Sequence, residues 1–204
     1  MKLKYTKVAT LAATLIIFGS LAGGANAAVI IGVTASTDMG EFRPISNITN
    51  GSGLTGLQHL NGDPATDFIG SMWQSASGNP TGNVTFDLGG SFTVQSTRIW
   101  NHNHYLGNSV MGLDIASSTD GVVFTPINSF VLSQGTGVDD YVGESLSLGG
   151  VTASHIRFLI TSNYGGSVTG LSEVQFSTVP EPSSALLVGL SALGLAVARR
   201  RKTN

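Results

Sequence analysis

The chain has 204 residues, no cysteine and a formal net charge of −2. Seven of its ten basic residues lie near the two ends, so residues 28–178 hold three arginines against eleven acidic residues, a net charge of −8. Such a body repels nucleic-acid phosphates and anionic lipids, and the absence of cysteine excludes thiol chemistry and Cys-ligated zinc or iron–sulfur sites.

The N-terminus has the three parts of a secretory signal peptide. Three lysines precede an apolar stretch, residues 8–21, and an A-x-A cleavage motif ends at Ala27. We therefore predict that residues 1–27 are removed and that the protein leaves the cytoplasm. Residues 28–178 are then predicted to form one domain, which is long enough to have a core of its own.

Short stretches that alternate apolar and polar residues make up most of this domain, as is typical of β-strands. The alternating apolar residues are Val84, Phe86, Leu88, Phe92, Val94, Leu113, Ile115, Leu146, Leu148, Ile156, Phe158, Ile160, Val174 and Phe176. Turn signals separate them at Gly89-Gly90, Asp120-Gly121 and Gly149-Gly150. Many short strands with frequent turns predict an all-β fold, an antiparallel β-sandwich. Residues 47–79 lack the alternation and are predicted to be a long polar loop, a kind of segment that is often functional.

Several segments occur in an order that resembles the discoidin domain, also called the coagulation-factor C-type or galactose-binding-like domain. They read N-G-D-P-A-T from Asn61, D-L-G from Asp87, S-S-T-D-G-x-x-F from Ser117, I-R-F from Ile156 and G-L-S-E-V from Gly170. The resemblance covers about residues 33–177 and implies a jelly-roll β-sandwich. The alternative is an unrelated sandwich with ordinary hairpins.

Many discoidin-like domains hold a structural Ca²⁺, and the resemblance implies such a site here. The matching residues are Asn61, Asp63, Thr66 and Glu173. Asn61 replaces an aspartate of the family pattern and so removes one charge from a site whose metal binds carboxylate and carbonyl oxygens. Further candidate ligands are Asp67 and the turn Asn50-Gly51-Ser52. The alternative is that residues 61–64 only form a turn and that Glu173 is a surface acid.

Residues 100–105, Trp-Asn-His-Asn-His-Tyr, form the densest group of polar and aromatic residues. Carbohydrate sites combine aromatic rings, which contact the C–H faces of a sugar, with amide or imidazole groups that bond its hydroxyls. In discoidin-like carbohydrate-binding modules the ligand lies on loops at one end of the sandwich. The candidate ligand-binding residues are Trp73, Asn101, His102, His104, Tyr105 and Tyr164. Two alternatives stay open: a structural role in the core, and a zinc site at His102 and His104, for which no third ligand is evident.

Residues 179–204 combine a Pro-Glu-Pro motif, an apolar stretch over 183–198 and a basic cluster. The motif and cluster are Pro180, Glu181 and Pro182, and Arg199, Arg200, Arg201 and Lys202. As a helix the stretch would be roughly 24 Å long, slightly shorter than the ~30 Å hydrocarbon core of a bilayer, and the cations are expected to stay on the cytoplasmic side.

This pattern resembles the PEP-CTERM sorting signal of Gram-negative, exopolysaccharide-producing bacteria. The resemblance implies that an exosortase, a membrane transpeptidase, cuts near the motif after transient membrane insertion through residues 183–198. The alternative is an ordinary tail anchor.

We therefore predict an exported, non-catalytic protein of the cell surface or extracellular matrix that contacts polysaccharide and binds no nucleic acid. The sequence contains no G-x-S-x-G, H-E-x-x-H or P-loop motif and no carboxylate pair in a distinctive context. Two alternatives remain: a purely structural matrix protein without a specific ligand, and a carbohydrate-active enzyme.

Overall fold

The computed structural model describes residues 27–61 and 70–178. The predicted signal peptide, the predicted calcium ligands Asp63 and Thr66 with the reserve ligand Asp67, and the sorting segment 179–204 lie outside the described residues. Within the described ranges, no helix is both long and apolar enough to cross a bilayer.

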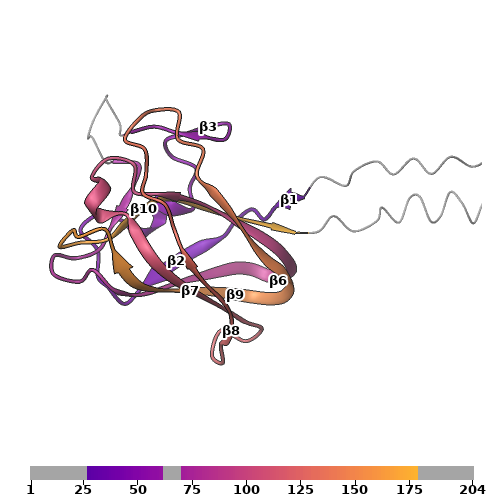
Figure 1. The fold of residues 1–204 in the computed structure, drawn as a ribbon. Helices are drawn as coiled ribbons and strands as arrows, with labels where there is room; N and C mark the ends of the chain where they lie inside the picture. Colours follow the sequence, from indigo (N-terminus) through magenta and orange to yellow (C-terminus); the bar gives the residue numbers. More distant parts are fainter. Residues whose placement is uncertain (1–26, 62–69, 179–204) are drawn as a thin grey trace, which may run out of the picture.

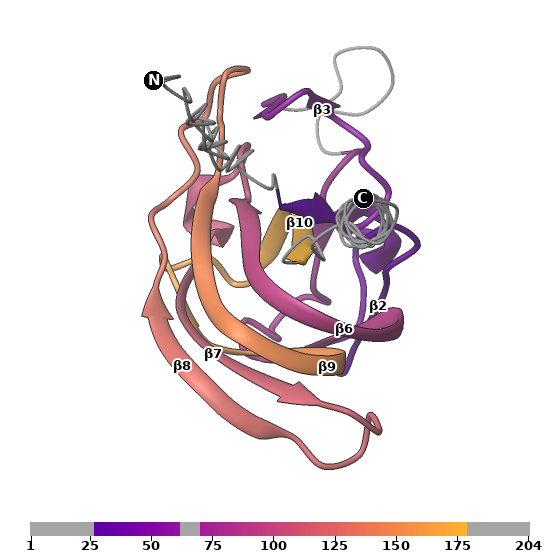
Figure 2. The same ribbon diagram turned by 90° about the vertical axis from the view of Figure 1, so that its right-hand side faces the viewer.

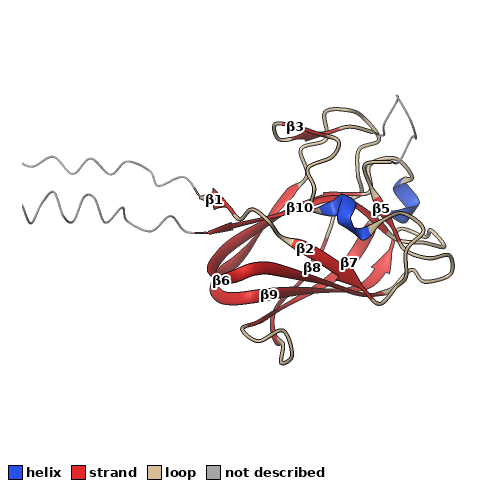
Figure 3. Ribbon diagram, turned by 180° about the vertical axis from the view of Figure 1, so that it is seen from behind, coloured by secondary structure: helices blue, strands red, loops and turns tan. Residues whose placement is uncertain are grey.

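The described chain consists almost entirely of β-strands and loops (Figures 1 and 3). The strands are β1 (Ala28–Val29), β2 (Thr34–Thr37), β3 (Leu54–Thr55), β4 (Gln58–His59), β5 (Trp73–Gln74), β6 (Gly82–Asn101), β7 (Val110–Ser118), β8 (Thr125–Val131), β9 (Glu144–Asn163) and β10 (Gly170–Thr178). Two short 3₁₀ helices are η1 (Ile45–Ile48) and η2 (Leu106–Asn108). The named strands pair antiparallel, and the predicted all-β antiparallel sandwich is confirmed.

The sheet has the strand order β1-β10-β6-β9-β7-β8, with β2 paired to β6 and β5 to β10. The two long strands β6 and β9 contribute to both layers of the sandwich. The first part of β6 lies between β2 and the end of β9, where Val84 pairs with Phe158. Its second part lies between β10 and the start of β9, where Thr97 pairs with Leu146. Figure 2 shows both strands curving strongly between these parts.

The predicted turns at Gly89-Gly90 and Gly149-Gly150 are wrong, because both glycine pairs lie inside strands of 20 residues. The pairing of β6 with β9 shifts register between Asp87 and Phe92 and again between Val94 and Ser96. Three of the four glycines have φ between +71° and +75°, which is favourable only for glycine. Bulges of this kind bend a strand, so the glycines allow one strand to serve both layers.

The core forms between the layers from the residues that alternate along the strands. Every alternating apolar residue of the prediction is buried, except Phe92 and Leu146, which pack against the core while partly exposed. Phe86 makes edge-to-face contacts with Phe158 and with Phe176, at ring-centroid distances of 4.9 and 5.1 Å. Phe176 belongs to β10, so this cluster joins the two layers. Burying one such side chain contributes about 1.5–3 kcal/mol.

Two loop predictions had different outcomes. The Asp120-Gly121 turn is confirmed: Gly121 has φ +74°, and the Asp120 carboxylate accepts hydrogen bonds from the N–H groups of Val122 and Val123, each at 2.9 Å. The predicted polar loop over residues 47–79 includes the end of η1 and three two-residue strands, β3, β4 and β5. These strands are too short to leave an alternation pattern.

The ends of the described domain lie side by side, since Ala28 pairs with Thr178. The loop that carries η2 lies at the opposite end of the molecule (Figure 1).

Candidate functional site

The loop between β6 and β7 begins with a buried asparagine that bonds only backbone. Asn101 is fully buried. Its amide donates to Val110 O at 2.7 Å and to Ser133 O at 2.8 Å, and its Oδ1 accepts from the N–H groups of His102 and Val110. All four hydrogen-bonding positions of the side chain are used. Asn101 therefore fixes the start of the loop against β7 and the segment after β8.

His102 is also buried, and it supports the turn that follows. Its Nδ1 accepts hydrogen bonds from the N–H groups of His104 and Tyr105, at 3.3 and 3.1 Å. The ring proton is therefore on Nε2, which faces the Gln74 amide at 3.0 Å; the amide must turn its oxygen toward that proton. Burial, helped by the nearby His104 and His59, lowers the pKa of His102 to about 3, so the ring is neutral at physiological pH.

Asn103 completes a frame of three buried polar residues. Its amide donates to His59 O at 3.2 Å and Val138 O at 2.7 Å, while its Oδ1 accepts from the Gly137 N–H at 2.9 Å. The loop before β9 and the β4 hairpin are thus tied to the same segment. The three buried side chains, 101–103, hold the remaining part of the loop, residues 104–108, at the surface.

Residues 104–108 line a surface cleft of about 630 Å³. Other lining residues are Phe42, Gln74, Ser77, Ser167 and Val168. Phe42 and Tyr105 are the large exposed aromatic side chains of the cleft, with 66% and 53% of their surface accessible. Tyr105 contacts the His104 ring edge to face at a centroid distance of 4.6 Å, and it stacks over His102 at 6.1 Å. The cleft thus combines aromatic faces with amide, hydroxyl and imidazole groups, as a carbohydrate site requires.

His104 is held from the side by Asn61, a predicted calcium ligand. The Nδ1 atom of His104 lies 2.8 Å from Asn61 O and 3.0 Å from Asn61 Oδ1, two acceptors, so Nδ1 carries the proton. The Asn61 amide also donates to Gly137 O, and its backbone N–H donates to Asp139. The structure therefore places Asn61 beside the cleft, with its amide oxygen directed at His104.

The structure separates the predicted ligand-binding residues into two groups. His104 and Tyr105 line the cleft. Trp73, Asn101 and His102 have no accessible surface, so they cannot contact a ligand in this structure. Their burial agrees with the alternative of a structural role in the core. Tyr164 is half-buried, and its hydroxyl donates to Leu132 O at 2.7 Å. This hydrogen bond links the residue that follows β9 to the residue that follows β8.

The zinc alternative for the histidines does not fit this geometry. Both ring nitrogens of His102 already have partners, so His102 cannot share a zinc ion with His104. Among residues 27–61 and 70–178, no group of three or more His, Cys, Asp or Glu side chains is arranged to hold a metal. Sequence analysis missed Phe42, a lone aromatic between charged residues, because nothing in its local pattern signals that it lies across from Tyr105.

Glu173 is not a surface acid. The side chain is 2% exposed, and its Oε2 accepts a hydrogen bond from the Gly51 N–H at 3.2 Å. Burial raises the pKa of Glu173 to about 8, and the Gly51 hydrogen bond offsets this only in part. The partner belongs to the turn Asn50-Gly51-Ser52, in which Asn50 Oδ1 accepts from the Ser52 N–H at 2.7 Å. A buried carboxylate with one neutral donor is costly to ionise unless a cation accompanies it.

Comparisons with known families agree with both resemblances. Residues 32–174 match the F5/8 type C domain family, and residues 178–202 match the PEP-CTERM protein-sorting motif. The predicted discoidin-like domain and the predicted sorting signal are thereby confirmed. A search of curated proteins found no match.

Solved structures with the same fold include carbohydrate-binding modules. A family 32 module of a family 89 glycoside hydrolase from Clostridium perfringens, in complex with GalNAc-β-1,3-galactose, is 15% identical, with a TM-score of 0.53; the match covers 73% of this chain and 99% of that one. The family 32 module of C. perfringens NanJ, in complex with galactose, is 16% identical with a TM-score of 0.51, covering 74% and 98%. Against a family 89 glycoside hydrolase of the same organism, the similarity covers 74% of this chain and only 14% of the hydrolase.

Proposed function

Since the chain belongs to the F5/8 type C domain family and carries a PEP-CTERM motif, we propose that it is an exported protein that binds surface polysaccharide through the loop cleft. The pair of exposed aromatic residues, Phe42 and Tyr105, carries this proposal, because both rings line one cleft together with polar groups, the combination by which proteins bind sugars. Two solved relatives of the same fold are complexes with galactose-containing sugars.

The proposed role is binding without catalysis. None of the described residues that line the cleft is an aspartate or glutamate. Glycoside hydrolysis generally requires two carboxyl groups on either side of the scissile bond. The composition of the cleft therefore favours a binding site over the carbohydrate-active enzyme. The same aromatic pair favours binding over a purely structural matrix protein.

A retention experiment tests the cleft. The double variant Phe42→Ala/Tyr105→Ala should lose retention on a column of the host's exopolysaccharide, and its melting curve should stay unchanged because both side chains are exposed. Val131→Ala, a change at an apolar residue on the edge strand that is 79% exposed, is the control. Retention of the double variant equal to that of the wild type would remove the cleft from the proposal.

The proposed route to the surface follows from the two ends of the chain. Signal peptidase would remove residues 1–27, and exosortase would process the Pro180-Glu181-Pro182 motif after transient insertion of 183–198 in a Gram-negative inner membrane. Intact-mass analysis of the exported protein tests this route. A major species that keeps residues 185–204 would contradict it.

We also propose a structural Ca²⁺ at Glu173. The buried carboxylate supports this, because the ion would offset the cost of ionising it. The turn 50–52 is the described segment that contacts the Glu173 carboxylate, through the Gly51 N–H, while Asp63 and Thr66 lie outside the described residues. At pH 8, calcium at a hundredfold excess over Kd should raise the free energy of unfolding by about 2.7 kcal/mol relative to chelator, and the melting temperature should rise with it. Glu173→Gln should remove that difference, and superimposable wild-type melts would exclude the ion.

A further inference from the structure

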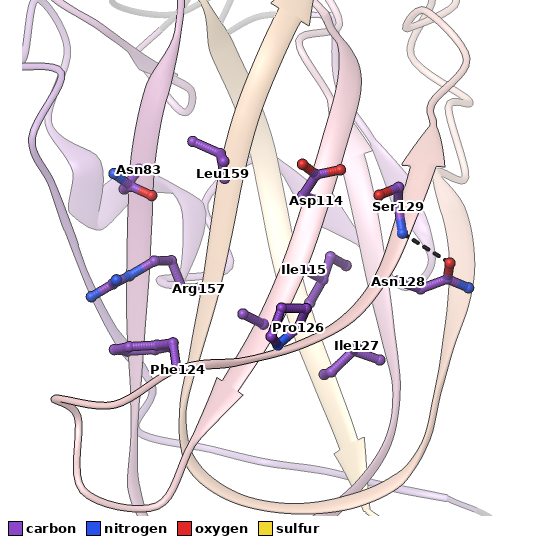
Figure 4. Close-up of a pocket in the computed structure, with 11 residues that line it drawn as sticks. Asn83, Asp114, Ile115, Phe124, Pro126, Ile127, Asn128, Ser129, Arg157 and Leu159 are labelled. Atoms are coloured by element: carbon purple, nitrogen blue, oxygen red, sulfur yellow. Dashed lines mark hydrogen bonds between the residues drawn. The ribbon is translucent and has the colours of Figure 1, made fainter.

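The solvent-facing side of one layer carries a groove that is separate from the loop cleft. It consists of two depressions of about 440 Å³ each, which share the lining residues Asn83 and Arg157. One depression is lined from β2 by residues 36–38. The other crosses β9 and β7 and reaches Ser129 on β8 (Figure 4).

Strand register places the groove across five neighbouring strands. Ser36, Thr85, Arg157, Ala116 and Pro126 are successive cross-strand neighbours from β2 through β6, β9 and β7 to β8. Adjacent strands lie about 4.8 Å apart, so this row spans about 19 Å. A groove of that length fits an extended chain better than a single sugar.

Arg157 is held in the middle of the row by its own neighbours. Its guanidinium carbon lies 3.6 Å from the centroid of the Phe124 ring, and its Nε donates to Thr85 Oγ1 at 3.4 Å. The terminal Nη groups have no hydrogen-bond partner among the described residues. Stacking thus fixes the side chain while leaving donors for a ligand. On the β2 side, Asp38 accepts two hydrogen bonds from Asn83, both at 2.7 Å.

The other half of the groove offers acceptors above an apolar floor. The carboxylate of Asp114 lines the groove and has no hydrogen-bond partner within the described residues. Leu159 is 41% exposed and lies beside Asp114 and Arg157 in Figure 4, with Pro126 and Ile127 continuing the floor. Polar groups at the sides of an apolar floor match the alternating hydroxyls and C–H faces of a sugar chain.

We propose that this groove is a second carbohydrate site, which binds an internal stretch of a neutral polysaccharide chain. Three charged groups face the groove, Arg157, Asp38 and Asp114, with a net charge of −1. The domain itself has a net charge of −8, so a polyanion is repelled. A sugar hydroxyl can accept a hydrogen bond from a guanidinium and donate one to a carboxylate. Hydrogen bonds to such charged groups are stronger than those between neutral groups. The site does not depend on the loop cleft, and together the two would allow one domain to engage a matrix at two points.

The test uses the full chain in mild non-ionic detergent and affinity electrophoresis in gels that contain dextran, xylan, galactan or mannan, with alginate and polygalacturonate as acidic probes. Ala116→Glu places a carboxylate on the floor next to Arg157, where the new side chain pairs with the guanidinium and blocks the groove. Arg157→Gln removes the charged donors. Ile31→Glu, at a residue 88% exposed and outside the groove, is the control for the added charge.

At least one neutral polysaccharide should retard the wild type, and Ala116→Glu and Arg157→Gln should each weaken this about tenfold. Ile31→Glu should not. In a Phe42→Ala/Tyr105→Ala background, Ala116→Glu and Arg157→Gln should still weaken the retardation. Three results would overturn the inference: no retardation by any neutral polymer, preferential retardation by the acidic probes, or unchanged binding by folded Ala116→Glu. Loss of binding only in the cleft double variant would support the loop cleft and reject the groove.

Discussion

Two halves of one loop differ in what their polar side chains do. In residues 101–103 the side chains are fully buried, and their hydrogen bonds reach β7, the segment after β8, the β4 hairpin and Gln74. In residues 104–108 the side chains line the cleft, and Tyr105 is more than half exposed. The comparison teaches that a run rich in Asn, His and aromatic residues need not be a binding site throughout. Here one half forms the support and the other half forms the surface.

The largest effect is expected in the supporting half. Asn101→Ala removes four hydrogen bonds and takes away the partner of three buried groups, the N–H groups of His102 and Val110 and the Val110 O, and of the half-buried Ser133 O. Each unsatisfied buried group costs about 1–3 kcal/mol, so the free energy of unfolding should fall on the order of 5 kcal/mol, as measured by urea denaturation.

Asn79→Ala is the matched control for Asn101→Ala. Asn79 is exposed and makes one side-chain hydrogen bond, to Met39 O, so its loss should cost about 1 kcal/mol or less. Equal losses in the two variants would mean that water replaces the bonds of Asn101, and that the two halves of the loop do not differ in support.

Sequence analysis predicted the core well and the site only in part, for a physical reason. Alternation records which side of a strand is buried, so Phe86 and Phe158 are identifiable from spacing alone. Burial of Asn101 and His102 depends on carbonyls from distant segments, which no local pattern reports. Glycine pairs are compatible with both turns and bulges, so the continuity of β6 through Gly89 was not predictable. Phe42 reaches the cleft through a tertiary contact with β5, in which the Phe42 N–H donates a hydrogen bond to Gln74 O.

A pH titration of stability tests another buried polar group, Glu173 on β10. Its folded-state pKa, about 8, is above the ordinary value of 4.5. The neutral acid therefore contributes stability fully below about pH 4.5, and that contribution is lost as the pH rises to about 8. Without calcium, the contribution of Glu173 to the free energy of unfolding should fall by on the order of 3 kcal/mol between pH 5 and pH 8.

Glu173→Gln isolates this contribution, because it keeps the shape and removes the titration. The difference in unfolding free energy between wild type and variant should change with pH in chelator and should change much less in calcium, where the ion stabilises the carboxylate. Parallel pH profiles in chelator would show that Glu173 is solvated in the folded protein. His102 acts in the opposite direction: its folded-state pKa of about 3 lies below the ordinary value of 6.5, so its contribution to stability is present above pH 6.5 and is lost as the pH falls toward 3. This contribution is the same in wild type and Glu173→Gln and cancels in their difference.

The smallest effect on stability is expected in the exposed half of the loop, and it separates a ligand contact from a structural one. Tyr105 makes an edge contact with His104 and a distant stack with His102, and its side chain makes no hydrogen bond among the described residues. Tyr105→Ala should therefore change the free energy of unfolding by less than about 0.5 kcal/mol. Retention on the exopolysaccharide column should nevertheless fall severalfold, since the aromatic face for the sugar is lost. Tyr105→Phe keeps that face, so it should keep most of the retention if ring stacking dominates, whereas loss equal to that of Tyr105→Ala would assign the contact to the phenol hydroxyl. A Tyr105→Ala protein that unfolds would place this residue with the support formed by 101–103, and the distinction between the two halves of the loop would fail.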